Sequence, residues 1–195
     1  MIASSTRNLS TDQNDLIHFQ NNSIIENKIT RFRQNGQIQI YQSSYRGSYS
    51  TIIRDSLRNA ALGRKVLLAQ LMKGGVNQGI SSPIKLCGNL LWIRASNSFD
   101  HYESSILDKD KNISESIKNS INELWDFCKE QLLNGEQDQV ILDEIFKAIE
   151  LGIINENDLI STLENRFISG DVILTGTTIP KNFLLMADQV TELRS

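Results

Sequence analysis

Six residues in the C-terminal half of the chain, Gln139-Val140-Ile141-Leu142-Asp143-Glu144, constrain the fold more than any other stretch. The run of Val, Ile and Leu has no polar alternation, which is typical of a central strand covered on both faces. Because ligands of open α/β sheets bind at the carboxyl ends of strands, the acids that follow suggest a Walker B segment. Asp143 and Glu144 are therefore candidate ligands for a Mg²⁺ ion that accompanies nucleotide phosphates. The alternative is a buried strand that ends in ordinary surface acids.

Charge and composition exclude several classes of partner. The 195 residues carry 20 basic and 23 acidic side chains, a net charge of −3. The two signs are interspersed, so no field of one sign attracts nucleic acid or anionic lipid. No apolar run approaches the length of a membrane span, and residues 1–15 lack the apolar core of a signal peptide. We expect a cytoplasmic protein that binds neither nucleic acid nor membrane.

The cysteines do not predict a metal cluster or a disulfide framework. Cys87 and Cys128 are far apart in the sequence, and the chain contains only 2 histidines. Zinc sites and disulfide scaffolds both need more cysteines or histidines at closer spacing. We expect both cysteines to lie in the core.

The chain is predicted to contain a polar N-terminal arm, residues 1–35, partly helical or disordered, and one domain, residues 36–195. Gly, Ser, Asn and Pro predict a loop over residues 74–89. Strands are expected at residues 37–41, 66–69, 90–93, 140–142 and 172–174. Helices are expected at residues 50–62, 113–132, 145–151 and 155–163, and after Pro180. Strands alternating with helices at this spacing predict an α/β fold, a three-layer parallel sheet with helices on both faces.

The loop after the first strand is where a Walker A motif, G-x-x-x-x-G-K-[ST], would cradle phosphates at a helix N-terminus. Here only Gly47 keeps its place; Ser48 stands for the lysine and Tyr49 for the residue whose hydroxyl binds magnesium. Arg46 and Lys73 are cations that could act instead. The alternative is a Ser/Gly turn without a ligand. The candidate nucleotide-binding residues are Ser43, Ser44, Arg46, Gly47, Ser48, Tyr49, Ser50 and Lys73.

Several segments of the chain resemble the P-loop family of corrinoid adenosyltransferases, over about residues 37–194. Residues 140–145, Val-Ile-Leu-Asp-Glu-Ile, resemble that family's VVLDEI strand. Residues 171–180 resemble its VILTGRxxP segment, and residues 187–194 resemble ADLVTEMR. Residues 70–74, Gln-Leu-Met-Lys-Gly, are similar to its QFxKG segment. The order and spacing of these motifs imply a sheet of P-loop NTPase type.

The resemblance implies a reaction and its cofactors, Mg-ATP and a corrinoid. Family members join Co(I) of a reduced corrinoid, cob(I)alamin or cob(I)yrinic acid a,c-diamide, to C5′ of ATP and release triphosphate, in cobalamin biosynthesis or salvage. This chain departs from the family at Ser48, Tyr49 and Thr177, the last of which replaces the arginine of TGR. Losing one charge-assisted hydrogen bond weakens binding about 10- to 100-fold. We therefore expect Mg-ATP to bind more weakly than about 1 mM.

A polar loop after the third strand carries Phe99, His101 and Tyr102. It maps near the aromatic loop that faces the corrinoid in the family, so the resemblance implies that these side chains contact the macrocycle. Packing on the protein surface is the alternative reading.

Three functions follow from these patterns. The first is a corrinoid adenosyltransferase-like protein with weakened or lost ATP binding and turnover. The second is a non-catalytic family member that binds a corrinoid or a partner protein, and the third is another P-loop nucleotide-binding protein. The sequence assigns no catalytic residue, and it leaves open both enzymatic activity and a homodimer. The Walker interpretation requires Gly47, Asp143 and Thr175 to meet in one cleft, on the same side of the sheet as residues 43–48.

Overall fold

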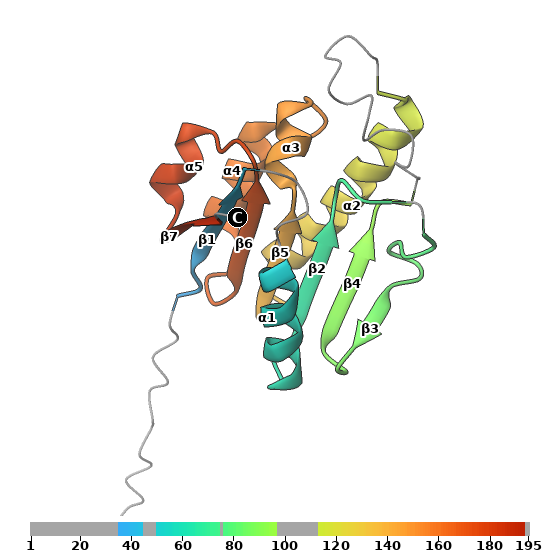
Figure 1. Cartoon of the computed structure of the whole chain (residues 1–195), viewed down its shortest axis with the longest axis vertical. Coiled ribbons are helices and arrows are strands. Elements are labelled where there is room, and N and C mark those ends of the chain that lie inside the picture. Colours follow the sequence, from blue (N-terminus) through green and yellow to red (C-terminus); the bar gives the residue numbers. More distant parts are fainter. Residues whose placement is uncertain (1–34, 45–49, 75, 97–112, 194–195) are drawn as a thin grey trace, which may run out of the picture. The chain divides into compact units, whose positions relative to one another are not determined.

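The computed structural model describes residues 35–44, 50–74, 76–96 and 113–193. Strands and helices alternate along most of this part of the chain (Figure 1). In chain order they are β1 (Ile38–Ser43), α1 (Ser50–Ala61), β2 (Val66–Gln70), β3 (Ile84–Leu86), β4 (Leu90–Arg94), α2 (Glu115–Asn134), β5 (Gln139–Asp143), α3 (Ile145–Glu150), α4 (Glu156–Asn165), β6 (Asp171–Gly176), α5 (Lys181–Met186) and β7 (Gln189–Leu193).

The strands form one sheet of order β3-β4-β2-β5-β6-β1-β7. All neighbouring strands are parallel except β3, which runs antiparallel to β4. The strands β1, β2, β4, β5, β6 and β7 therefore end at the same edge, which we call the carboxyl edge. The predicted α/β fold with a largely parallel sheet is confirmed.

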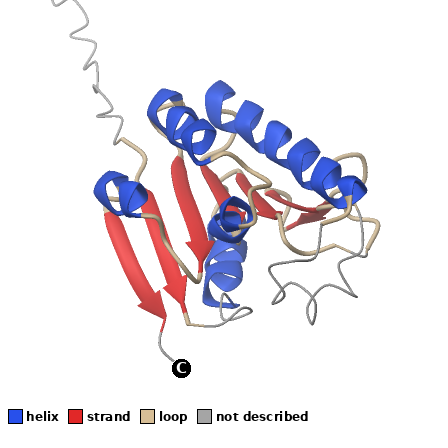
Figure 2. Ribbon diagram, turned by 90° about the horizontal axis from the view of Figure 1, so that it is seen from above, coloured by secondary structure: helices blue, strands red, loops and turns tan. Residues whose placement is uncertain are grey.

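Helices cover both faces of this sheet (Figure 2). On one face, α1 contributes Ile52 and Ala60 to an apolar cluster with Leu68 and Ile141 of the central strands. On the other face, the apolar side chains of α2, α3, α4 and α5 form the larger core cluster with alternate strand residues. In β5 all five residues are buried, as its unbroken apolar sequence predicts. Covering both faces removes the polar alternation of a half-exposed strand.

Residues at the helix ends behave as their sequences predict. Gly135 follows α2 in the left-handed conformation, with φ of 68°, and its N–H donates to Gln131 O at 3.2 Å. The side chain of Asn155 accepts a hydrogen bond from Asn157 N at 2.8 Å and so caps α4. These caps satisfy backbone groups that a helix end leaves without partners.

The predicted loop over residues 74–89 is wrong at one point, because residues 84–86 form β3. This edge strand pairs with β4 alone, and its side chains are largely exposed, so its sequence carries no pattern of burial. Cys87 lies in the turn between these strands and is exposed, which contradicts its predicted place in the core. Cys128 on α2 is buried, as predicted.

The C-terminal strand β7 was also not predicted. It pairs with β1, and its side chains are exposed or half-buried because it lies at the other edge of the sheet. Among the described helices, none is both long enough and apolar enough to cross a membrane.

Candidate functional site at the carboxyl edge

On the sheet face that α1 covers, an apolar row of side chains is followed by a polar row at the carboxyl edge. The apolar row consists of Ile173, Ile141, Leu68 and Trp92, on β6, β5, β2 and β4. Two positions further along these strands, the polar row consists of Thr175, Asp143, Gln70 and Arg94. Alternate residues of a strand point to the same face. Regular strand register therefore brings four polar side chains into one line.

Asp143 is the centre of this row and is only 3% exposed. Its Oδ1 accepts a hydrogen bond from Thr175 Oγ1 at 2.9 Å, and its Oδ2 accepts one from Gln70 Nε2 at 2.8 Å. Lys73 Nζ lies 3.4 Å from Oδ2. A buried carboxylate is costly unless it is paired and hydrogen-bonded. These three donors meet that requirement and hold the carboxylate in one orientation.

Gln70 connects Asp143 to the next strand. Its side chain is buried, and its Oε1 accepts hydrogen bonds from Trp92 Nε1 at 3.0 Å and from Arg94 Nε at 2.8 Å. Two donors on Oε1 and a carboxylate acceptor beside Nε2 determine which end of the amide is oxygen. Gln70 therefore links Arg94 to Asp143 through one continuous set of hydrogen bonds.

Thr175 and Glu144 complete the site on the β6 side. Thr175 Oγ1, which donates to Asp143, accepts a hydrogen bond from Glu144 N at 2.7 Å. Glu144 itself is buried and adopts a left-handed backbone conformation with φ of 61°, directly before α3. Non-glycine residues rarely adopt this conformation unless their surroundings hold them there. The hydrogen bond to Thr175 is one such restraint.

The six described candidate site residues are all at or near the carboxyl edge. Ser43 is buried at the end of β1, Ser44 follows it, and Ser50 begins α1. Lys73 contacts Asp143, and Glu144 follows Asp143 in the chain. Asp143 and Thr175 meet as the Walker interpretation requires. Arg46, Gly47, Ser48, Tyr49, Phe99, His101 and Tyr102 lie outside the described residues, so their predicted roles stay predictions.

Three residues of the polar network, Gln70, Trp92 and Arg94, were not predicted from the sequence. Gln70 resembles Asp143 in one respect, because it is a polar residue that ends an unbroken buried strand. That pattern was a usable signal. No sequence signal pairs Trp92 and Arg94 with Gln70, because their contact depends on β2 and β4 being neighbours.

Asp143 and Glu144 limit how a Mg²⁺ ion could bind at this edge of the sheet. In the described part of the chain, no three His, Cys, Asp or Glu residues come together as a metal cluster. Both oxygens of Asp143 already accept hydrogen bonds, so little of the carboxylate is left for a direct bond. Mg²⁺ commonly keeps several waters and binds to one or two carboxylates together with substrate phosphates. The residues would fit an ion held mainly by water and phosphate oxygens, and Asp143 would accept hydrogen bonds from that water.

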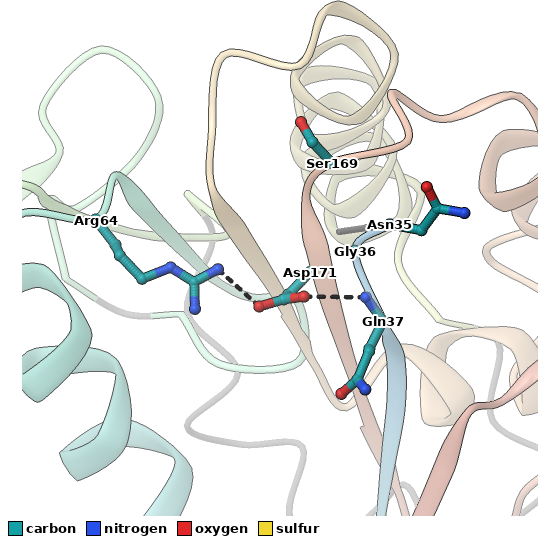
Figure 3. A pocket seen from close by; sticks show the side chains of 6 residues that line it. All are labelled: Asn35, Gly36, Gln37, Arg64, Ser169 and Asp171. Atoms are coloured by element: carbon teal, nitrogen blue, oxygen red, sulfur yellow. Dashed lines mark hydrogen bonds and ion pairs between the residues drawn. The ribbon is translucent and has the colours of Figure 1, made fainter. Parts of the chain in front are cut away.

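A pocket of about 440 Å³ lies at the opposite, amino edge of the sheet (Figure 3). It is lined by Asn35, Gly36, Gln37, Arg64, Ser169 and Asp171. Arg64 Nη2 contacts Asp171 Oδ2 at 2.6 Å, and Gln37 N donates to Asp171 Oδ1 at 3.0 Å. The charges of this pocket thus pair with each other and join the starts of β1, β2 and β6. We assign the pocket a structural role.

Comparison with known proteins identifies a matching family model and several similar proteins. The family model for ATP:corrinoid adenosyltransferase BtuR/CobO/CobP matches residues 34–195. Proteins named corrinoid adenosyltransferase from Escherichia coli strains K12 and O6:H1 CFT073 are each 24% identical over 161 residues, covering 83% of this chain and 78% of theirs. An uncharacterized protein from Nostoc sp. is 30% identical over 70 residues, covering 36% of this chain and 18% of its own.

Proposed function

The chain belongs to the ATP:corrinoid adenosyltransferase family BtuR/CobO/CobP, and from this we propose that it binds a corrinoid at the carboxyl edge and binds Mg-ATP weakly. In the family reaction, a bond forms between Co(I) and C5′ of ATP, the C5′–O bond breaks, and triphosphate leaves. The observation that carries the proposal is the arrangement around Asp143. The Asp143 carboxylate is oriented by Thr175 and Gln70 at the carboxyl edge, and Ser48 stands in the sequence where the family pattern has a lysine.

The strand order supports a sheet of P-loop type. The end of β1 and the start of α1 are at the same edge as Asp143, and β6 alone lies between β1 and β5. Backbone N–H groups at a helix N-terminus attract anions. An anion bound at the start of α1 would therefore lie on the same side of the sheet as the Asp143 carboxylate.

Lys73 is the described cation best placed to help bind phosphate. Its side chain is 34% exposed, and its contact with Asp143, at 3.4 Å, is long for a charge-assisted hydrogen bond. The contact is long, and Thr175 and Gln70 still donate hydrogen bonds to the buried Asp143 carboxylate when it breaks. Lys73 can therefore turn from Asp143 to a phosphate oxygen. A bound Mg²⁺ would supply further positive charge to the triphosphate, with Asp143 orienting its water ligands.

We propose that ATP binds weakly because three residues depart from the family pattern. Ser48, Tyr49 and Thr177 stand where the family pattern has lysine, threonine and arginine. Thr177 is not charged, and its backbone carbonyl accepts a hydrogen bond from Gln42 Nε2 at 3.0 Å. Each missing cation weakens binding about 10- to 100-fold. We expect a dissociation constant for Mg-ATP above about 1 mM.

For the corrinoid, we propose contacts from Phe99, His101 and Tyr102, which follow β4 in the sequence. A flat macrocycle needs an apolar or amphipathic surface to replace its lower axial ligand. Reduced cobalamin should then change its absorption spectrum when the protein is added. An unchanged spectrum at high protein concentration would remove the corrinoid half of the proposal.

Calorimetry with Mg-ATP tests the phosphate loop. We compare the unmodified chain with the variant Ser48→Lys/Tyr49→Thr, which restores the lysine and the small hydroxyl residue. A matched control, Leu62→Lys, adds the same charge after the far end of α1, where Leu62 is 73% exposed. We expect a dissociation constant for Mg-ATP above about 1 mM for the unmodified chain and for the control. The double variant should bind Mg-ATP at least about 10-fold more tightly.

Two outcomes of this experiment would change the conclusion. Micromolar binding by the unmodified chain would mean that Arg46 or Lys73 has replaced the missing cations, and would favour an active transferase. No gain in the double variant would mean that the loop no longer wraps an anion. A spectral change with cobalamin would then leave a corrinoid-binding protein without turnover.

A further inference from the structure

Arg94 ends β4 and is held more firmly than an ordinary surface arginine. Its Nε donates to Gln70 Oε1 at 2.8 Å, and its guanidinium lies over the ring of Trp92, 5.1 Å from the ring centroid. Its backbone N–H donates to Gln78 O at 2.8 Å, and Gln78 is itself buried. Arginine loses much rotamer freedom when it is ordered in this way. The protein meets that cost before any ligand arrives.

The contacts of Arg94 use one side of the guanidinium and leave the other available. Within the described residues, no carboxylate pairs with Arg94, and no acceptor contacts its Nη1 or Nη2 atoms. The only interactions of its side chain there are with Gln70 and Trp92. A guanidinium oriented by its Nε presents its terminal N–H groups as a fork, which matches the two oxygens of a carboxylate or a phosphate. Arg94 thus has the form of an anion-binding group that is already oriented.

The position of Arg94 indicates which substrate it would meet. Strands β2, β5 and β6 lie between β4 and β1, so Arg94 is four strand spacings, roughly 19 Å, from the strand that leads into the phosphate loop. In the other direction, Arg94 is five residues before Phe99. Arg94 is therefore far from the strand that leads into the phosphate loop, and in the sequence it directly precedes the segment that carries the proposed corrinoid contacts.

We propose that Arg94 is a specificity residue, which binds an anionic group on the rim of the corrinoid. This inference rests on the proposed function. The anion could be a free carboxylate of a corrinoid whose side chains are incompletely amidated, or the phosphodiester of one that carries a nucleotide loop. Both present paired oxygens to the Arg94 fork, whereas a fully amidated corrinoid without the nucleotide offers only neutral carbonyls there.

Equilibrium dialysis with three corrinoids tests the proposal. The probes are cobyrinic acid a,c-diamide, which has free carboxylates, cobalamin, which has the phosphodiester, and cobinamide, which has neither. We expect the unmodified protein to bind at least one of the first two more tightly than cobinamide. Arg94→Met, which keeps an unbranched apolar stem over Trp92, should weaken that corrinoid about 10- to 100-fold. Its affinity for cobinamide should stay within about 2-fold of the unmodified protein's, because no charged hydrogen bond to that probe is lost.

Two further variants separate recognition from folding and from general charge. Arg94→Lys keeps the charge but loses the fork, so the preferred anionic corrinoid should bind with intermediate affinity. Arg58→Met removes the same charge from the last turn of α1, away from the carboxyl edge, and should change none of the three affinities. Circular dichroism melting curves establish that each variant is folded. If Arg94→Met does not fold, Arg94→Lys carries the test.

The possible results overturn different statements. If the unmodified protein binds no corrinoid, the proposed function fails, and this inference fails with it. If the protein binds corrinoids without preferring an anionic one, the inference alone is wrong. It is also wrong if the Arg94 variants weaken all three probes equally, because Arg94 would then act only by supporting Gln70 and Asp143. Selective loss of the carboxylate probe or of the phosphodiester probe identifies the anion.

Discussion

Thr175 donates its hydroxyl hydrogen to Asp143 and accepts the backbone N–H of Glu144, so one side chain satisfies two buried groups of the neighbouring strand end. Replacing Thr175 by Val, which has the same shape, leaves both groups without that partner. Each unsatisfied buried group costs about 1–3 kcal/mol. We expect Thr175→Val to lower the free energy of unfolding by at least about 1–3 kcal/mol, and urea titration measures this loss.

The control for this substitution is Thr162→Val on α4. Thr162 is also buried, but its hydroxyl donates to the backbone carbonyl of Asp158, one turn earlier in the same helix, at 2.7 Å. That carbonyl remains in position for the helical hydrogen bond. Thr162→Val should therefore cost less, about 1 kcal/mol or below. Equal losses in the two variants would mean that Thr175 does not anchor Asp143.

Asp158 should make stability depend on pH. Its carboxylate joins α4 to α2, accepting hydrogen bonds from Trp125 Nε1 at 2.7 Å and from Lys129 Nζ at 2.8 Å. Burial opposes ionisation, but the hydrogen bonds from Lys129 and Trp125 outweigh it and hold the pKa of Asp158 below its ordinary value. A lowered folded-state pKa stabilises the fold above the unfolded pKa of about 3.9, and this stabilisation is lost as pH falls through the folded value.

We therefore expect Asp158→Asn to be less stable than the unmodified chain at pH 7, by about 1 kcal/mol because the side chain is 41% exposed. The difference should shrink as the pH is lowered below about 4. Urea unfolding at pH 7, 5 and 3 measures it. Asp126→Asn removes an exposed acid 4.0 Å from the same lysine and should show little difference at any pH. If the difference in free energy of unfolding between the unmodified chain and Asp158→Asn grows as the pH is lowered, the pKa of Asp158 is not lowered in the folded protein.

The cysteines should react at very different rates. Cys87 is exposed in the β3–β4 turn, whereas Cys128 is fully buried and burial raises the pKa of its thiol. Because the thiolate is the reactive form, both access and ionisation protect Cys128. Titration with a thiol reagent at pH 8 should modify one cysteine in the folded protein and a second only in denaturant. Cys87→Ser should remove the fast reaction, and its persistence would show that Cys128 is accessible.

Gly135 and Gly152 separate backbone strain from side-chain crowding. Both are left-handed, with φ of 68° and 67°. A Cβ on Gly135 would collide with the Phe167 side chain, whereas one on Gly152 would meet nothing within 4 Å. Gly152→Ala should cost about 1–2 kcal/mol from the backbone alone, and Gly135→Ala should cost more. Thermal unfolding of the two variants measures the difference, and equal melting temperatures would mean that Phe167 moves freely.

The central strands could be predicted because a strand that is buried on both faces consists almost entirely of apolar residues. Val140, Ile141 and Leu142 have no polar neighbour that would mark an exposed face, and the structure buries all of them. The edge strands β3 and β7 could not be predicted in this way. Each has a neighbouring strand on one side only. Strand β3 pairs with β4, which runs in the opposite direction, and β7 pairs with β1, which is distant in the sequence.

The sequence by itself determined the parallel α/β fold, the family and the position of Asp143 at the end of a buried strand, because these depend on local patterns of apolar and polar residues. Only the tertiary structure decided which side chains orient that carboxylate. Gln70 and Thr175 are 73 and 32 residues from Asp143 and reach it because β2 and β6 flank β5. Arg94 joins them through the register of β4 with β2. Strand order depends on how the whole sheet packs, so no local pattern predicts which strands become the neighbours of β5.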